Sequence, residues 1–392
     1  MVVAHISELI AGGSTIRVFP AVERWLVSDL HTRIDKLNRV YFDSFAATAW
    51  VGIRNAFVSS LLFLAVGLLA LRLRSSVLPG VLLIIIQNSA GLLNIVKQGL
   101  MALDQVQRSS NCIQRLDHYA HGLEAERSNR PGFNLDKSWP SKGKIEFRDL
   151  SMRYRPGLPF AVRDLNFAIE GGEKIGVVGR TGAGKSTIFS ILLGMVDPSQ
   201  GLLVIDNVDI TSIGVNELRE GLSVIPQEPT LFAGTIRSNL DPRNERSEEE
   251  LDAALRRTSL LMSGSNEKRS SLSLDFALSP GGANLSSGQR QLLSLARAIV
   301  RNTRIILIDE ATANVDYETD TRIQGMLMSE FAGRTVVTIA HRIQTIMKYD
   351  KVLVLNAGRM VEFGEPKMLW QLKDGWFRAL CDQSSILEKD FT

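Results

Sequence analysis

The sequence predicts an α/β domain built on a buried sheet, preceded by a helical segment that crosses a membrane. The α/β domain is predicted by a glycine-rich loop at 179–187, which lies between an apolar run and a helical pattern, and by further apolar runs after it. The membrane segment is predicted by residues 55–71 and 75–96, because neither run carries a charged side chain.

The first stretch, from Ile6 to Tyr41, has charged residues recurring among apolar ones at helical spacing, with an interruption at Gly12-Gly13-Ser14. This pattern predicts long amphipathic helices with a turn at Gly12-Gly13. The recurring charges indicate that these helices do not lie within a membrane.

The two uncharged runs are each close to the length of about 20 residues that crosses a hydrocarbon core. The short link Arg72-Leu73-Arg74 between them predicts an antiparallel pair of spans. A buried core hairpin is the alternative, but the lack of charge along both runs favours the membrane. The polar residues within the second run, Gln87, Asn88 and Asn94, would then face other helices or a pore.

Basic residues are more frequent at the outer ends of this pair than in the link, which predicts that the outer ends face the cytoplasm. The outer basic residues are Arg24, Arg33, Lys36, Arg39, Arg54, Lys97, Arg108 and Arg115, against Arg72 and Arg74 in the link. Residues 100–123 are again amphipathic and continue the second span into the cytosol. We therefore expect a partial transmembrane domain at 1–123, a linker rich in proline, glycine, serine and charge at 124–143, and an α/β domain at 144–392.

Composition excludes some classes of function. The net charge is +3 and no strong basic patch is apparent, which argues against nucleic acid as a partner. The chain has two cysteines, Cys112 and Cys381, without metal-binding spacing, so buried or idle thiols in a reducing compartment are expected.

The α/β domain opens with two alternating segments, Lys144–Leu150 and Leu165–Ile169, which predict an antiparallel strand group. Continuous apolar runs at Leu202–Asp206 and Arg304–Asp309 predict strands buried in a helix-covered sheet. Residues 336–340 and 352–355 add strands, and helical stretches lie between them. The pattern predicts a three-layer α/β domain.

The glycine-rich loop has the form G-x-x-x-x-G-K-[ST] and lies between the apolar run Ile175–Val178 and a helix. Glycines let the backbone fold around a phosphate, Lys185 supplies charge to the β- and γ-phosphates, and the hydroxyl of Ser186 can ligate Mg²⁺. The loop therefore predicts a site for a nucleotide with Mg²⁺. Its predicted phosphate-binding residues are Gly179, Thr181, Gly182, Ala183, Gly184, Lys185, Ser186 and Thr187.

Two further motifs complete this pattern. The apolar strand 305–308 ends in Asp309 and Glu310, which could hold Mg²⁺ and activate a water respectively. Upstream, Leu285-Ser286-Ser287-Gly288-Gln289 precedes an amphipathic helix that Ser286 or Ser287 can cap, which leaves a positive helix end for an anion.

The ordered set of these motifs resembles the nucleotide-binding domain of ATP-binding-cassette (ABC) transporters. The LSSGQ turn separates that family from other P-loop NTPases, and the segments 226–242 and 309–316 look like the C subfamily, the multidrug-resistance-associated-protein-like exporters. The resemblance covers nearly the whole chain and looks like the C-terminal cassette with the last two spans before it. The ordered set is Tyr154, Gly179–Thr187, Gln227, Leu285–Gln289, Ile305–Glu310, Asp316 and His341.

The resemblance implies a role for each of these residues. Tyr154 would stack on adenine, Gln227 would contact Mg²⁺ and water, and His341 would contact the γ-phosphate. Glu310 would be the catalytic base, and Ser186, Gln227 and Asp309 would surround Mg²⁺. Ser286, Gly288 and Gln289 would act on the nucleotide of an opposite cassette, and Asp316 would lie in the loop that crosses the cassette pair.

The resemblance also implies the fold, activity and partners. The fold is a P-loop NTPase with a RecA-like core, an antiparallel β subdomain and a helical signature subdomain, after a partial transmembrane domain with two of the family's six spans. The activity is ATP hydrolysis coupled to export of an organic solute or conjugate. Partners are a second cassette, the missing helices and the lipid bilayer, with the cassette cytosolic. Regulation of a channel and a truncated, non-transporting product remain alternatives.

Overall fold

The computed structural model describes residues 2–73, 78–123, 125–127, 135–136, 138–258, 260, 272–310, 317–340, 342–384 and 386. The chain divides into two compact units, Met1–Glu124 and Ala125–Thr392. Each unit is described by itself.

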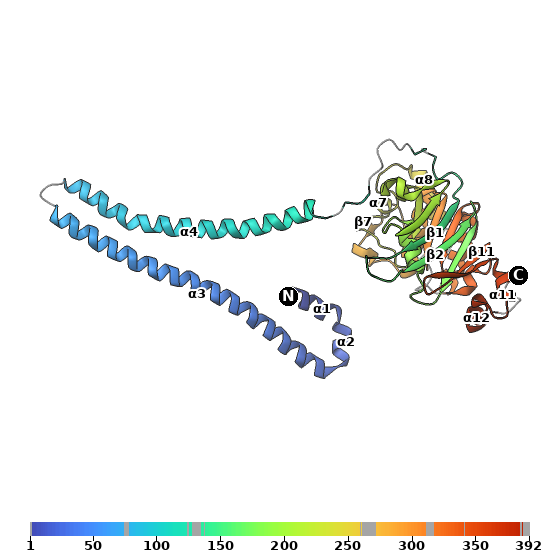
Figure 1. Cartoon of the computed structure of the whole chain (residues 1–392), viewed down its shortest axis with the longest axis horizontal. Coiled ribbons are helices and arrows are strands. Elements are labelled where there is room, and N and C mark those ends of the chain that lie inside the picture. The colour runs from blue at the N-terminus through green and yellow to red at the C-terminus, as the bar shows by residue number, and fades with distance from the viewer. Residues whose placement is uncertain are drawn as a thin grey trace. The chain divides into compact units, whose positions relative to one another are not determined.

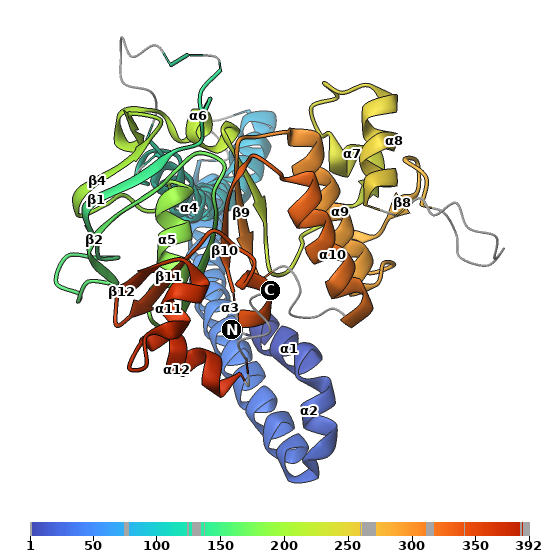
Figure 2. The same cartoon turned by 90° about the vertical axis from the view of Figure 1, so that its right-hand side faces the viewer.

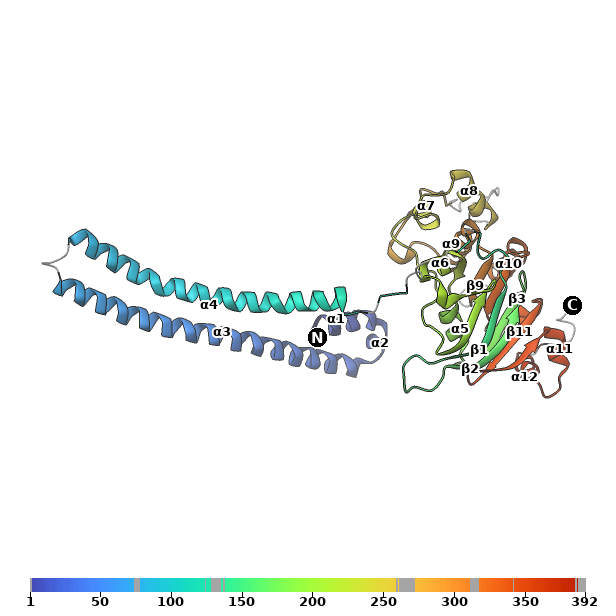
Figure 3. The same ribbon diagram turned by 45° about the horizontal axis from the view of Figure 1, so that its top comes forward.

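The described residues of the first unit form four helices, of which α3 and α4 are long and lie side by side (Figures 1 and 3). Both long helices begin at a proline, which has no N–H to leave unpaired at that position. Gly12 separates the two short helices, as the sequence predicts. The helices are α1 (Val2–Ala11), α2 (Gly13–Val18), α3 (Pro20–Arg72) and α4 (Pro79–His121).

The predicted amphipathic segment begins in α1 and α2, and its part from Pro20 to Tyr41 forms one continuous helix, α3, with the first uncharged run. This helix has 53 residues. Among the described residues, the stretch Val22–Arg72 is the helix that is long and apolar enough to cross a membrane. Its apolar side chains, such as Phe57, Leu64 and Leu68, are exposed within this unit. The second predicted span falls partly on Ser75, Ser76 and Val77, which lie outside the described residues, and α4 continues from Pro79 to His121.

The second unit is built around a six-stranded sheet in the order β12-β11-β3-β10-β9-β6, parallel except for the antiparallel pair β11 and β12. Its central strands are almost completely buried, which explains their continuous apolar sequences. The strands are β3 (Lys174–Gly179), β6 (Leu222–Ile225), β9 (Ile305–Asp309), β10 (Thr335–Ile339), β11 (Lys351–Asn356) and β12 (Arg359–Gly364).

A second, antiparallel sheet in the order β2-β1-β4-β5 confirms the predicted antiparallel group. Phe147 and Phe167 stack across β1 and β2, with ring centroids 4.4 Å apart. The strands are β1 (Ile145–Met152), β2 (Val162–Ile169), β4 (Gln200–Ile205) and β5 (Val208–Asp209).

One strand assignment was wrong. The run Leu202–Asp206 was expected in the helix-covered sheet, but it forms β4 and pairs with β1 in the antiparallel sheet. Its residues Leu203 and Ile205 are buried because one core joins both sheets through helix α5 (Lys185–Leu192). A continuous apolar run predicts that a strand is buried, but it does not identify the sheet to which the strand belongs.

The remaining helices divide between the two sides of the parallel sheet. Figure 2 shows α7, α8, α9 and α10 on one side of β9 and β10, and α5 with the antiparallel sheet on the other. A separate core of leucines, including Leu251, Leu255 and Leu293, holds the first group together. These helices are α6 (Val215–Glu220), α7 (Ile236–Leu240), α8 (Glu248–Arg257), α9 (Ser287–Arg301), α10 (Tyr317–Glu330), α11 (Pro366–Gln371) and α12 (Trp376–Gln383), with short strands β7 (Gly234–Thr235) and β8 (Ala277–Leu278).

Candidate functional site

The glycine-rich loop joins the carboxyl end of β3 to the start of α5, as the sequence predicts. Gly184 precedes the helix with φ +101°, a conformation that L side chains rarely adopt. A Cβ atom there would lie 2.8 Å from Val162 Cγ1 and 2.9 Å from the carbonyl oxygen of Ala161. The conformation of the loop is therefore fixed by its close packing against the start of β2 as well as by the turn at Gly184.

Lys185 lies inside this loop, with only 7% of its surface exposed. Its Nζ donates hydrogen bonds to the carbonyl oxygens of Gly179, at 2.7 Å, and Arg180, at 3.2 Å. Burial lowers the pKa of Lys185, and the carboxylates of Glu310 and Asp309 partly oppose that shift. The ammonium group thus lies within the electrostatic field of the two acids that end β9.

The sheet register brings these acids to the phosphate loop. Strand β10 lies between β3 and β9, and its residue Ile339 is opposite Val177 on one side and Asp309 on the other. Neighbouring strands are about 4.8 Å apart, so Val177 and Asp309 are about 10 Å apart across the sheet. The carboxyl ends of parallel strands therefore place Asp309 at the same edge as the loop.

Glu310 follows with a left-handed backbone (φ 44°), and its N–H donates to the carbonyl oxygen of Ile339. This turn carries its side chain to Gln227, whose Nε2 donates to Glu310 Oε2 at 2.7 Å. The amide oxygen of Gln227 is then the atom that could approach a cation. Together with the Ser186 hydroxyl and Asp309, it offers the oxygen ligands that Mg²⁺ prefers.

Tyr154 is tied to the helix after the phosphate loop. Its hydroxyl is 3.1 Å from Thr187 Oγ1, and Thr187 itself is buried. Tyr154 nevertheless remains 54% exposed, so its ring can offer a face to a flat ligand while its hydroxyl stays anchored.

The LSSGQ turn forms the start of α9, and Ser286 rather than Ser287 is the cap. Ser286 Oγ accepts from the N–H of Gln289, and the Gln289 side chain accepts from the N–H of Ser286. This reciprocal capping box fixes the turn and directs the helix N-terminus outward. Among the described residues, no hydrogen bond or ion pair joins this turn to the phosphate loop of the same chain.

Two positioning residues on α9 were not predicted from the sequence. Gln291 is buried and donates to the carbonyl oxygen of Pro226, at 3.3 Å, directly before Gln227. Arg297 donates to the carbonyl oxygens of Thr230, at 2.8 Å, and Asn239, at 2.7 Å. The sequence did contain a signal for both residues, because each is a polar residue on the apolar face of the predicted helix. His341 and Asp316 lie outside the described residues.

Known proteins resemble this chain in sequence and in fold. The family model described as ABC transporter matches residues 162–313. The chain is 41% identical over 402 residues to the ABC-type transporter cicA of Emericella nidulans, covering 99% of this chain and 29% of that protein. It is 41% identical to the oligomycin resistance ATP-dependent permease YOR1 of Saccharomyces cerevisiae, covering 99% and 27%. It is 38% identical to human ATP-binding cassette sub-family C member 3, covering 93% and 24%.

The chain thus spans less than a third of the length of these curated relatives. A solved structure described as a bacterial Atm1-family ABC exporter with ATP bound has a TM-score of 0.84 and 23% identity to the chain. That likeness covers 98% of this chain and 67% of the other, and it shows a shared fold.

Proposed function

Residues 162–313 of this chain belong to the ABC transporter family, and from this premise we propose that the chain binds Mg·ATP and hydrolyses it to drive export of an organic solute. One observation carries the proposal. The buried ammonium of Lys185, the acids Asp309 and Glu310, and the amide of Gln227 converge at the carboxyl edge of one parallel sheet.

The residues divide into groups that bind ATP and groups that act on water. The loop residues Gly179–Thr187 would surround the phosphates, and Lys185 would exchange its two carbonyl partners for β- and γ-phosphate oxygens. Tyr154, anchored by Thr187, would stack on adenine. These contacts bind and orient ATP.

Glu310 is the group best placed to act on water. Its hydrogen bond from Gln227 holds the carboxylate in one orientation, so it can accept a proton from a water aimed at the γ-phosphate. His341 would contact the γ-phosphate as well. Mg²⁺, held by Ser186, Gln227 and Asp309, would neutralise developing charge on the phosphate oxygens.

The Ser286–Gln289 turn completes a second site in a partner. Its capped helix end offers N–H groups to an anion, and no hydrogen bond or ion pair joins it to the phosphate loop of its own chain among the described residues. We propose that Ser286, Gly288 and Gln289 reach the nucleotide of a second cassette, in the same full-length protein or in a partner chain. The missing transmembrane helices and the lipid bilayer are the other partners, and the cassette lies in the cytosol.

Co-expression tests this function. The chain is produced together with a fragment that carries the missing spans and a first cassette, and inside-out vesicles are assayed for ATP-dependent uptake of organic anions and drugs. We expect accumulation that requires both ATP and an intact Glu310. ATP hydrolysis without uptake of any solute, but with an ATP-gated ion current, would instead support regulation of a channel.

A further inference from the structure

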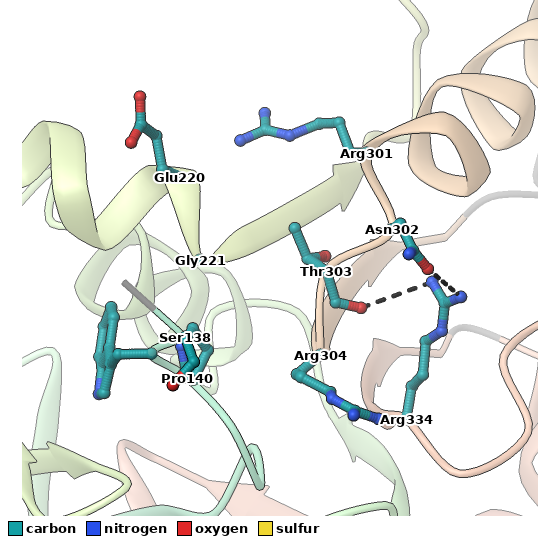
Figure 4. A pocket seen from close by; sticks show the side chains of 10 residues that line it. Ser138, Pro140, Glu220, Gly221, Arg301, Asn302, Thr303, Arg304 and Arg334 are labelled. Carbon is teal, nitrogen blue, oxygen red and sulfur yellow. Dashed lines mark hydrogen bonds between the residues drawn. The ribbon is translucent and has the colours of Figure 1, made fainter. Parts of the chain in front are cut away.

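A second polar pocket lies at the opposite edge of the parallel sheet from the ATP site. It is formed where strands β6, β9 and β10 begin, at Gly221, Arg304 and Arg334, and where α9 ends, at Arg301 (Figure 4). Its volume is about 430 Å³, within the range of about 300–1,000 Å³ that is typical of small-ligand sites. Because the phosphate loop lies at the carboxyl ends of the strands, the two sites are separate.

Three arginines supply the charge of this pocket. Arg301, Arg304 and Arg334 come from different elements, and the single acid in the lining is Glu220. Glu220 is already bonded to Arg243, at 2.9 Å. The described residues place no carboxylate within 4.0 Å of any of the three guanidinium groups.

The acids around the pocket are bound to an outer set of arginines. Arg219 holds Glu126 at 2.8 Å, Arg243 holds Glu220, and Arg257 holds Glu330. Within the part of the chain that the structure describes, the pocket arginines Arg301 and Arg334 donate hydrogen bonds to neutral groups alone. Arg334 donates to Asn302 Oδ1 at 2.7 Å, and Arg301 donates to the carbonyl oxygen of Arg219 at 2.8 Å. The pocket therefore has an excess of positive charge, because the nearby glutamates already pair with other arginines.

Partial removal from water and like charges act against this arrangement. Desolvation lowers the pKa of both Arg301 and Arg334. Arg243 adds to this shift for Arg301, as Arg257 and Arg304 do for Arg334, whereas Glu220 and Glu330 partly oppose the respective shifts. An anion in the pocket would offset this repulsion. The planar forks of guanidinium groups match the oxygens of phosphate in particular.

We propose that this pocket, with Arg301, Arg304 and Arg334, binds the phosphate group of a phosphate ester. The volume accommodates the phosphate together with the group that it esterifies. The ligand is either a small phosphorylated molecule or a phosphorylated side chain, and the positive charge that these arginines give to the pocket would attract the phosphate in both cases.

Calorimetric titration of the full chain in detergent, at about 0.15 M salt, tests this proposal. The probes are inorganic phosphate and O-phosphoserine, with unmodified serine as the matched control. We expect saturable binding of O-phosphoserine, no binding of serine, and an affinity at least about tenfold lower in Arg304→Gln, because a hydrogen bond between charged groups is lost. Arg304 makes no side-chain hydrogen bond among the described residues, so we expect the substitution to leave the fold intact.

Three variants assign the binding to the pocket. Arg359→Gln, on an exposed arginine that pairs with Asp164 elsewhere on the same unit, should bind as the wild type does. Arg304→Lys, which keeps the charge and loses the fork, should fall between wild type and Arg304→Gln. Lys185→Met should retain O-phosphoserine binding, because its site is at the other edge of the sheet.

Two outcomes would overturn the proposal. The first is a lack of saturable binding. The second is binding that is lost in Lys185→Met but unchanged in Arg304→Gln, because it would place the anion at the phosphate loop. Tighter binding of O-phosphoserine than of inorganic phosphate identifies an ester as the ligand. Competition by a phosphoserine peptide then distinguishes a phosphorylated chain from a free metabolite. Loss of ATP hydrolysis would leave these results unchanged, so the two proposals fail separately.

Discussion

At the scale of single residues, the site depends on groups held in unfavourable surroundings. Lys185 is charged and buried, and Glu310 has a backbone conformation that costs about 1–2 kcal/mol in a residue with a Cβ. Both residues lie at the sheet edge that carries the phosphate loop and the end of β9. Substitution of each residue can therefore separate a role in ATP chemistry from a role in stability.

Replacing Lys185 should weaken ATP binding without weakening the fold. Lys185→Met removes the charge offered to the phosphates, and we expect a loss of about 2–4 kcal/mol in ATP binding free energy. The folded-state pKa of Lys185 is lowered, so at neutral pH the unfolded chain holds this proton more tightly, and the buried charge reduces stability. Without nucleotide, Lys185→Met should be at least as stable as the wild type.

The measurements are equilibrium binding of labelled ATP and thermal unfolding in the absence of nucleotide. Lys174→Met, on a lysine at the start of the same strand β3, is the control, and its ATP affinity should not change. Equal ATP affinity in wild type and Lys185→Met would contradict the proposal that residues 179–187 bind the phosphates of ATP.

Glu310→Gln should separate binding from hydrolysis. The glutamine keeps the shape and can still accept the hydrogen bond from Gln227, but it cannot take a proton from water. We expect ATP to bind with nearly wild-type affinity while turnover falls by about 10²–10⁴-fold. Single-turnover assays with labelled ATP measure both steps. If turnover persists in a cassette pair in which this is the sole active site, Glu310 is not the catalytic base.

At the scale of elements, α9 connects the LSSGQ turn to the segment around Gln227. Its N-terminus carries the Ser286 cap, its middle holds Pro226 through Gln291, and its last turns hold Thr230 and Asn239 through Arg297. A shift of this helix would therefore move Gln227 and, through it, the Glu310 carboxylate. In the proposed function, this helix would connect the residues that act on a partner's nucleotide to those that act on the chain's own.

Arg297 is the residue whose loss should most weaken this connection. Arg297→Met leaves two carbonyl oxygens and the side chain of Asn239 without their charged donor. Because the half-buried guanidinium donates three hydrogen bonds, we expect about 2–4 kcal/mol less stability, which denaturant unfolding monitored by tryptophan fluorescence would measure. Arg256→Met, on the exposed face of α8, should change stability by less than about 0.5 kcal/mol. Equal effects of the two substitutions would contradict a structural role for Arg297.

At the scale of the whole molecule, the proposed function assigns to this chain parts of sites that a second cassette and further helices would complete. The phosphate loop and the LSSGQ turn lie in one folded unit without a hydrogen bond between them among the described residues. Helix α3 exposes apolar side chains along the segment that could cross a membrane. Both features favour assembly with a second cassette and with further helices.

The ATPase activity should therefore depend on protein concentration. We expect the specific activity of the purified chain in detergent to rise as cassettes pair, and Ser286→Arg, which obstructs the helix N-terminus, to abolish that rise. Mixing the Ser286→Arg chain with a Lys185→Met chain should restore activity in one of the two sites of the mixed pair. A specific activity that is constant over a hundredfold range of concentration would show that one chain forms a complete site.

The sequence by itself determined the features that depend on local order. These include the phosphate loop between a strand and a helix, the acids at the end of β9, a serine cap at the LSSGQ turn, the turn at Gly12 and most of the strands. Such features depend on residue types at fixed short spacings, because the interactions that form them join residues that are close in sequence. The structure then decided between the two candidate caps in favour of Ser286. The roles of His341 and Asp316 and the second span remain predictions.

Only the tertiary structure decided which distant residues meet. Gln227 bonds to Glu310 across 83 positions of sequence, Tyr154 bonds to Thr187 across 33, and Leu202–Ile205 joins the antiparallel rather than the parallel sheet. The arginine pocket likewise collects residues from three strand ends and one helix end. These pairings depend on sheet order and packing, because burial and hydrophobic periodicity specify that a segment is covered without specifying what covers it.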